Sequence, residues 1–235
     1  MTSAAPTPPA EMLASHQRQS ANLLNAENNL TGELFAWQAN YNAEAFQDTY
    51  LQTRDPEYLR AAQILFDGWM SRLFTDPEDG FRGWVGPYIY DNRFITEALV
   101  SDAILTRHLL RFARLVLVDE PALAEEFGEA ARRYAAFARR DIVGKWVERG
   151  TWHLDGPYGF FVTWPMMFTP DNLEERQPAD AEHARLGYQF NKQTLMGEVA
   201  LLLWQIDGDK AMRDIALRIA RLWKSRLNLF DGHYT

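Results

Sequence analysis

The sequence contains no cysteine, so a disulfide framework and a zinc site held by thiolates are both excluded. It also lacks any apolar run near the length of about 20 residues that a membrane-spanning helix needs. The five histidines are scattered and never show His-x-x-x-His spacing, so we expect neither a metal site nor a cofactor. Membrane insertion and the common metal chemistries are therefore not expected.

Basic residues are the minority charge, with 24 Lys and Arg against 32 Asp and Glu and a net charge of −8. Because phosphate contacts need clustered Lys and Arg, nucleic acid is not expected as a partner. Residues 1–10 are small and proline-rich without the apolar stretch of a signal peptide, which predicts a disordered tail. Both a cytoplasmic protein and a periplasmic or secreted one with its signal removed fit this composition, and the sequence fixes no oligomeric state.

Apolar residues recur at spacings of three and four over most of the chain, which predicts a helical protein. The helices 92–119 and 188–206 are apolar on nearly every side, so each should be enclosed by other elements. The helix that follows each of them has a single apolar stripe and a charged back. The helices are predicted at about 11–28, 37–54, 55–73, 92–119, 120–149, 188–206 and 209–227.

The connections between these helices alternate in length. Those at 54–56, 119–121 and 207–209 are short, whereas 74–91 and 150–187 are long and rich in tryptophan and tyrosine. Because the helices of a hairpin array run up and down, all short turns should lie at one end and all long loops at the other. The sequence therefore predicts an all-α fold over residues 11–235, a two-layer array of helical hairpins with long aromatic loops on one face.

A faint internal repeat supports this interpretation. Placing Asp55 on Asp209 also aligns Trp69 with Trp223 and the Ser-Arg-Leu triplet 71–73 with 225–227. Both tryptophans are therefore expected to pack between the two layers of the array.

The hairpin turns with their flanks, 50–62 and 191–216, resemble the alpha/alpha-toroid superfamily of carbohydrate-active enzymes. That superfamily comprises six- or seven-hairpin glycoside hydrolases, sugar epimerases and polysaccharide lyases. The Asn-Lys-Gln-Thr-Leu-Met-Gly opening at 191–197 and the late tryptophan of the outer helix are most similar to the alginate-lyase-like members. The resemblance covers about 37–229 and implies part of an (α/α)n toroid. Three hairpins are about half of such a toroid, so the domain is expected to be incomplete at its C-terminus.

The long-loop end of such an array collects the N-termini of the inner helices. Their free N–H groups and partial positive charge suit a carboxylate or an oxyanion, and aromatic rings there can stack on the faces of sugars. A polysaccharide or oligosaccharide is therefore the expected partner. The predicted substrate-binding residues are Arg82, Trp84, Tyr90, Asn92, Trp164, Tyr188, Gln193, His233 and Tyr234.

The resemblance implies eliminative cleavage of a uronic-acid polymer of the alginate or glucuronan type. A lyase of this kind neutralises the substrate carboxylate and needs a base for the C5 proton and an acid for the leaving oxygen. We expect Tyr88 or Tyr158 to carry the proton transfers. The neutralising groups are expected to be Arg93, His153 and Asn191, together with Arg82.

Two alternatives remain open. A glycoside hydrolase needs two carboxylates about 5–10 Å apart, and the acid-rich loops oppose a polyuronate and so favour this reaction. Candidate carboxylates are Asp79, Asp91, Asp155, Glu44, Glu97 and Glu198. The chain would otherwise be a non-catalytic helical scaffold that binds sugar or protein. His108, which lies mid-helix among leucines, is interpreted as a core histidine in every case.

Overall fold

The computed structural model describes residues 9–23, 31–89, 91, 93–162, 166–177, 190–227, 229–230 and 233–234. Most of the predicted N-terminal tail lies outside these residues. So do four of the predicted binding residues, Tyr90, Asn92, Trp164 and Tyr188.

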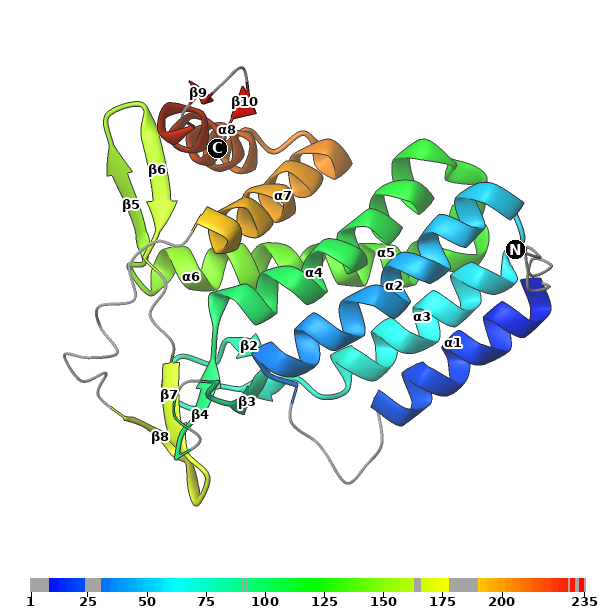
Figure 1. The fold of residues 1–235 in the computed structure, drawn as a ribbon, viewed down its shortest axis with the longest axis horizontal. Helices are drawn as coiled ribbons and strands as arrows, with labels where there is room; N and C mark the ends of the chain where they lie inside the picture. The colour runs from blue at the N-terminus through cyan, green and yellow to red at the C-terminus, as the bar shows by residue number, and fades with distance from the viewer. Residues whose placement is uncertain are drawn as a thin grey trace.

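Three helical hairpins form the body of the protein (Figure 1). Their first helices are α2 (Glu33–Thr53), α4 (Leu99–Arg114) and α7 (Phe190–Asp207). Their second helices are α3 (Glu57–Met70), α5 (Ala124–Phe137) and α8 (Lys210–Arg226). Helix α4 packs against α2 on one side and α7 on the other, and it also contacts α5 behind it. The predicted array of inner and outer helices is therefore present, with α1 (Pro9–Leu23) added against α2 and α3.

The second hairpin is extended by π-helical and 3-10 segments. Helix α4 continues as the π-helical segment η1 (Leu115–Asp119), and the 3-10 turn η2 (Pro121–Leu123) then leads into α5. Helix α5 passes through a second π-helical segment, η3 (Ala138–Gly144), into the short α6 (Lys145–Glu148). No helix of the described chain is both long and apolar enough to cross a membrane.

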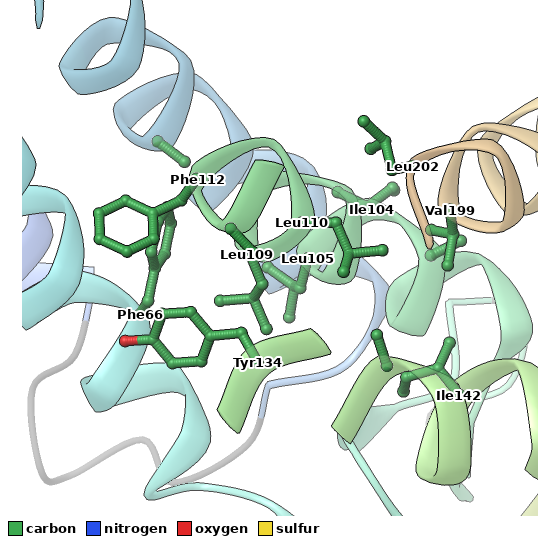
Figure 2. Close-up of a cluster of buried hydrophobic side chains, with 14 of the residues drawn as sticks. Phe66, Ile104, Leu105, Leu109, Leu110, Phe112, Tyr134, Ile142, Val199 and Leu202 are labelled. Atoms are coloured by element: carbon green, nitrogen blue, oxygen red, sulfur yellow. The ribbon is translucent and has the colours of Figure 1, made fainter. Parts of the chain in front are cut away.

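The core lies between the inner and outer helices (Figure 2). Phe66 of α3, Phe112 of α4 and Tyr134 of α5 form a triangle of edge-to-face rings with centroids 5.8–6.0 Å apart. On the other side of α4, Leu110 and Val199 connect the core to α7. Helix α4 is enclosed, as its apolar sequence predicts, except along one narrow stripe of arginines, because neighbours from three hairpins surround it.

The expectation of an all-α fold is wrong for the connections, which contain short strands. Strands β3 (Val85–Pro87), β4 (Ile95–Glu97), β7 (Met166–Thr169) and β8 (Asn172–Gln177) form an antiparallel sheet in that order. Two-stranded hairpins are formed by β1 (Phe74–Thr75) with β2 (Arg82–Gly83), β5 (Trp152–Asp155) with β6 (Tyr158–Phe161), and β9 (Leu229–Phe230) with β10 (His233–Tyr234). The protein is thus mostly helical with small sheets.

The four-stranded sheet confirms that the two long connections meet. Strand β4 belongs to the first of them and pairs with β7 of the second, and Val85, Ile95 and Phe168 form a small core there. The same pairing explains why the helix predicted from residue 92 begins only at Leu99. Residues 95–97 bond to strands on both sides, so they cannot take part in helical hydrogen bonds.

Two expectations about burial are wrong at the last hairpin. Helix α7 is not fully enclosed, because Leu201 keeps 38% of its surface open to solvent. Trp223 of α8 is 41% exposed, whereas Trp69, its partner in the repeat, is fully buried. Within the part of the chain that the structure describes, helices cover this hairpin only on the side of α4.

Candidate functional site on the inner helices

The predicted binding residues Trp84 and Gln193 are buried packing residues. The indole Nε1 of Trp84 donates to the carbonyl of Trp69 at 2.9 Å. The Gln193 amide accepts from the backbone N–H of Phe161 at 2.8 Å and donates to its carbonyl at 2.6 Å, so it fixes β6 to α7. Neither side chain is open to a substrate.

The predicted catalytic residues lie on separate elements. Tyr88 is buried and follows β3, and Arg93 lies in the same β3–β4 connection. His153 and Tyr158 belong to the β5–β6 hairpin, which packs against α8 at the same end of the helical body as the sheet (Figure 1). Asn191 is exposed at the start of α7.

The partners of the predicted site residues also point to structural roles. Arg93 pairs with Asp91 at 2.5 Å. The ring of His153 stacks on Phe160 with centroids 5.7 Å apart. Arg82 binds the buried Asp141 at 2.8 Å. His233 and Tyr234 form β10, which pairs with β9.

A buried ion network holds the junction between β4, α4 and α6. The ammonium of Lys145 contacts Glu97 and lies 2.7 Å from Asp102, and all three side chains are buried. Burial raises the pKa of Asp102 to about 6, against the opposing effect of Lys145. Gly83 lies so close that a Cβ there would be 1.6 Å from Glu97 Oε1, so only glycine fits. The network is structural, because none of these charges reaches solvent.

This network and its rim also account for several candidate carboxylates. Glu97 accepts from Arg149 at 2.6 Å, and Asp79 pairs with Arg149 at 2.8 Å and with Arg176. Of the other candidates, Asp155 is exposed at the end of β5. Glu44 and Glu198 differ from all of these because they share a solvent-open site.

That site is built on an arginine stripe of α4. Every residue of α4 is described, and only Arg107, Arg111 and Arg114 are not buried. Their spacing of four and three places them on one face of the helix. This face lies between α2 and α7, which flank α4 on either side.

Glutamates from both neighbouring helices meet these arginines. Arg111 lies 2.6 Å from Glu198 of α7 and 3.6 Å from Glu44 of α2. Arg107 lies 3.2 Å from Glu44 and 3.7 Å from Glu198. Burial lowers the pKa of Arg107, although the two carboxylates oppose this effect. Two carboxylates from different hairpins therefore share one pair of guanidinium groups.

A buried histidine lies beneath the arginines. His108 Nε2 is 2.6 Å from Asn40 Oδ1, and Gln47 donates to the His108 carbonyl at 2.8 Å. Burial, with smaller effects from Arg107 and Arg111, holds the pKa of His108 well below its ordinary value. It is the core histidine that the sequence predicts, and it stays neutral at pH 7.

Two aromatic rings continue the site toward the sheet end of α2. Tyr41 follows Trp37 by four residues and Glu44 follows Tyr41 by three, so the three share one face of α2. Trp37 is 39% exposed and Tyr41 is 70% exposed. Trp37 Nε1 donates to Glu33 at 3.4 Å, and Lys192 of α7 lies 3.7 Å from the same carboxylate. We define the inner face as Trp37, Tyr41, Glu44, Arg107, Arg111 and Glu198.

The inner face continues into a hollow at its other end. This hollow has a volume of about 260 Å³, and α2, α4, η1 and α7 all contribute to its lining. Exposed rings can stack on apolar faces of a ligand, and half-buried carboxylates and guanidiniums form strong directional hydrogen bonds with hydroxyl groups. The arrangement suits an uncharged polar ligand with apolar faces.

Sequence reasoning missed most of the inner face. The sequence indicates Glu44 and Glu198 only as candidate carboxylates for hydrolysis, and it predicts no site role for Trp37, Tyr41 or the two arginines. A signal was present, because three arginines at spacings of four and three on an otherwise apolar helix mark its one open stripe.

Comparisons with known proteins show a distant structural likeness. No protein-family profile and no curated protein matches the sequence. The Lin0763 protein from Listeria innocua has a TM-score of 0.52 and 15% identity, and the match covers 97% of this chain and 56% of that chain. The GH76A alpha-1,6-mannanase from Salegentibacter sp. HEL1_6 has a TM-score of 0.46 and 17% identity over 96% and 57% of the two chains.

An inactive variant of that mannanase in complex with alpha-1,6-mannotriose matches equally, with a TM-score of 0.46 and 16% identity. The chain spans little more than half the length of these structures. The likeness to Lin0763 concerns the fold alone, and the TM-score to the mannanase lies below 0.5. None of these comparisons supports the expected relation to alginate-lyase-like enzymes.

Proposed function

We propose that the inner face binds an oligosaccharide and that the protein has a carbohydrate-active role. The observation that carries this proposal is the alignment of two open aromatic rings with half-buried charged groups on three neighbouring helices. Trp37 and Tyr41 offer flat apolar surfaces for sugar rings. The Glu44 and Glu198 carboxylates and the arginines beside them offer acceptors and donors for hydroxyl groups.

The charge balance of the inner face favours a neutral glycan over a polyuronate. Arg107 and Arg111 already share Glu44 and Glu198, so a uronate would compete with these carboxylates for the same cations. A neutral sugar can bind both kinds of group without displacing either.

Glycan binding is tested by isothermal titration with a panel of soluble neutral polysaccharides, including alpha-1,6-mannan, and with alginate. Trp37→Ala should weaken binding of the neutral ligand about tenfold or more, since loss of a stacking ring costs upwards of about 1.4 kcal/mol. The matched control is Trp223→Ala, which removes a ring of similar exposure from α8. Equal binding by the two variants contradicts the assignment of the inner face.

Hydrolysis is the reaction we propose for this site. It is favoured because Glu44 and Glu198 contact the same two guanidiniums and so face a common space. Hydrolysis of a glycosidic bond uses such a pair, one carboxylic acid to protonate the leaving oxygen and one carboxylate as base or nucleophile.

The reaction is tested by measuring reducing ends released from a neutral glycan that binds. Glu44→Gln and Glu198→Gln should each abolish release while leaving binding within a few-fold. Ultraviolet absorbance of an unsaturated product from alginate would instead indicate elimination. Binding without release of reducing ends rejects the hydrolase proposal and leaves a sugar-binding scaffold.

A further inference from the structure

An apolar groove runs along the last hairpin, separate from the rings of the inner face. It encloses about 390 Å³ between α7 and α8. Leu201, Leu217 and Trp223 are exposed there although they are large and apolar. We define the α7–α8 groove as Gly197, Leu201, Ala216, Leu217, Ala220 and Trp223. Thr194, Ile219 and Glu198, the last a residue of the inner face, complete its lining.

The floor of the groove is shaped for close approach. Gly197, Ala216 and Ala220 project little from their helices. Gly197 also lets α7 pack closely on α8, since a Cβ there would lie 3.2 Å from Ile219 Cγ2. Small residues on neighbouring helices let another backbone come near. The leucines and the tryptophan then form apolar walls, as in grooves that receive an amphipathic helix.

The array itself shows what lies on such a surface elsewhere. The α2–α3 hairpin is covered by α1 on one side and packs against the second hairpin on the other. The second hairpin lies between the first and the third. Among the described residues, the α7–α8 hairpin packs helices against one side only. A helix is therefore the element that fits the groove.

Basic residues of α8 beside the groove indicate the charge that a partner should carry. Arg213, Arg221 and Lys224 lie on the exposed side of α8, and none forms an ion pair with a described residue; Arg213 instead lies over the Trp204 ring at 5.4 Å. By contrast, the contact between the outer helices α3 and α5 is closed by ion pairs. Arg60 lies 2.6 Å from Glu126, and Arg133 lies 2.5 Å from Asp67. Acidic residues are the complement that the α8 rim requires.

We propose that the α7–α8 groove binds an amphipathic helix that has an apolar stripe and an acidic flank. The stripe would cover Leu201 and Trp223, and the acidic flank would face Arg213 and Lys224. The bound helix would then lie on the third hairpin as the hairpins of the array lie on one another. Glu198 lines both the groove and the inner face, but the proposal does not rest on glycan binding, because the rings and arginines of the inner face take no part in it.

The probe is a stapled, fluorescent helical peptide with leucines at i, i+3, i+4 and i+7 and glutamates beside them. Its matched control has lysine at every glutamate position. Fluorescence anisotropy should show the acidic peptide binding about tenfold or more tightly than the basic one, because like charges face each other in the second complex. Equal affinities for the two peptides overturn the proposal.

Variants of the protein test the location. Leu201→Glu should weaken binding of the acidic peptide about tenfold or more, since it places a charge on the apolar wall. Ile64→Glu is the control, because Ile64 is 70% exposed on α3, away from the groove. Arg213→Glu combined with Lys224→Glu should reverse the preference between peptides. Circular dichroism confirms that each variant is folded, and unchanged binding by Leu201→Glu overturns the proposal.

A second copy of the chain is the competing occupant. Sedimentation equilibrium of the protein without peptide should show no association that depends on Leu201. A concentration-dependent dimer that Leu201→Glu dissociates assigns the groove to self-association and rejects the acidic partner helix.

Discussion

His108 and Asp102 show how burial acts in opposite directions on two residues of one helix. Burial lowers the pKa of His108 and raises that of Asp102 to about 6, because in both cases the charged form is the one disfavoured. As the pH falls, His108 is protonated in the unfolded chain before it is protonated in the folded protein, because its pKa is lower in the folded protein. Between pH of about 6 and the ordinary aspartate pKa of 3.8, Asp102 binds a proton in the folded protein but not in the unfolded chain.

We predict that His108 makes the protein less stable in mild acid. Its contribution is present above the unfolded pKa of about 6.5 and is lost as the pH falls toward the folded value, with a limiting slope of about 1.4 kcal/mol per pH unit. Denaturant unfolding of the protein and of His108→Gln, measured between about pH 7 and about pH 5, isolates this term from that of Asp102.

The variant should lose the slope attributed to His108 and keep the rest of the pH profile. Parallel profiles for the two proteins contradict a neutral buried imidazole. Such an outcome would mean that His108 is protonated in the fold, despite Arg107 and Arg111 nearby.

Single-residue roles were the least predictable feature of the sequence. Trp84 and Gln193 carry side chains that a sugar site uses, yet their hydrogen bonds close within the fold. Lys145 contacts Glu97 only because β4 and α6 lie close together in the fold. No spacing in the sequence predicts that contact. The arginines of α4 were predictable in principle, since their spacing depends on one helix alone.

At the level of elements, the turn between α7 and α8 shows a strong local signal. Gly208 adopts a positive φ of 76°, which L side chains rarely take. Asp209 then accepts from the backbone N–H of Ala211 at 2.8 Å and of Met212 at 3.4 Å, so it caps the first turn of α8. These two residues stop one helix and start the next.

We expect Asp209→Ala to lower the free energy of unfolding by about 1–2 kcal/mol, because it leaves helix N–H groups without a partner. Its contact with Arg139 is lost as well. The control is Asp214→Ala, which breaks an exposed pair with Arg218 on the same helix and should cost no more than about 0.5 kcal/mol. Equal costs in denaturant unfolding would contradict the capping role.

The strands were missed for a physical reason. Each of β3, β4 and β7 is three or four residues long, which is too short to show an alternating pattern. Their stability comes from pairing between distant segments, such as Ile95 with Phe168. Local sequence fixes the helices and their tight turns, whereas the sheet depends on contacts that no local pattern contains.

For the molecule as a whole, the internal repeat gives a matched pair of positions in different surroundings. Trp69 is fully buried, with its ring 5.1 Å from Phe66 and 6.5 Å from His108. Trp223 takes the same place in the third hairpin and is 41% exposed. The repeat thus predicts the position of each ring along its helix, and the number of neighbouring hairpins decides its burial.

We predict that Trp69→Ala lowers the free energy of unfolding by about 3–5 kcal/mol, whereas Trp223→Ala costs less than about 1 kcal/mol. The first substitution leaves a cavity in the core, whereas the second removes a side chain that is already partly exposed to solvent. Denaturant unfolding of both variants under one condition provides the comparison. Costs within about 1 kcal/mol of each other would contradict the difference in burial.

The overall topology was the most predictable feature. Alternating short and long connections led to the up-and-down array, and the pairing of β4 with β7 confirms that the long connections come together. The site was less predictable, because the aromatic residues of the long connections predict a site there. The open polar stripe instead lies along the helices, where α4 contacts the first and third hairpins.

The sharing of Arg107 and Arg111 has a mechanical consequence. Each guanidinium pairs with carboxylates from two hairpins. The same two arginines therefore stabilise both the contact between α2 and α4 and the contact between α4 and α7. A ligand that binds Glu198 in place of the arginines leaves both arginines to Glu44. The contact between α2 and α4 is then strengthened, and the contact between α4 and α7 is weakened. Occupancy of this surface would therefore redistribute rigidity across the array, with amide exchange slowing in α2 and quickening in α7.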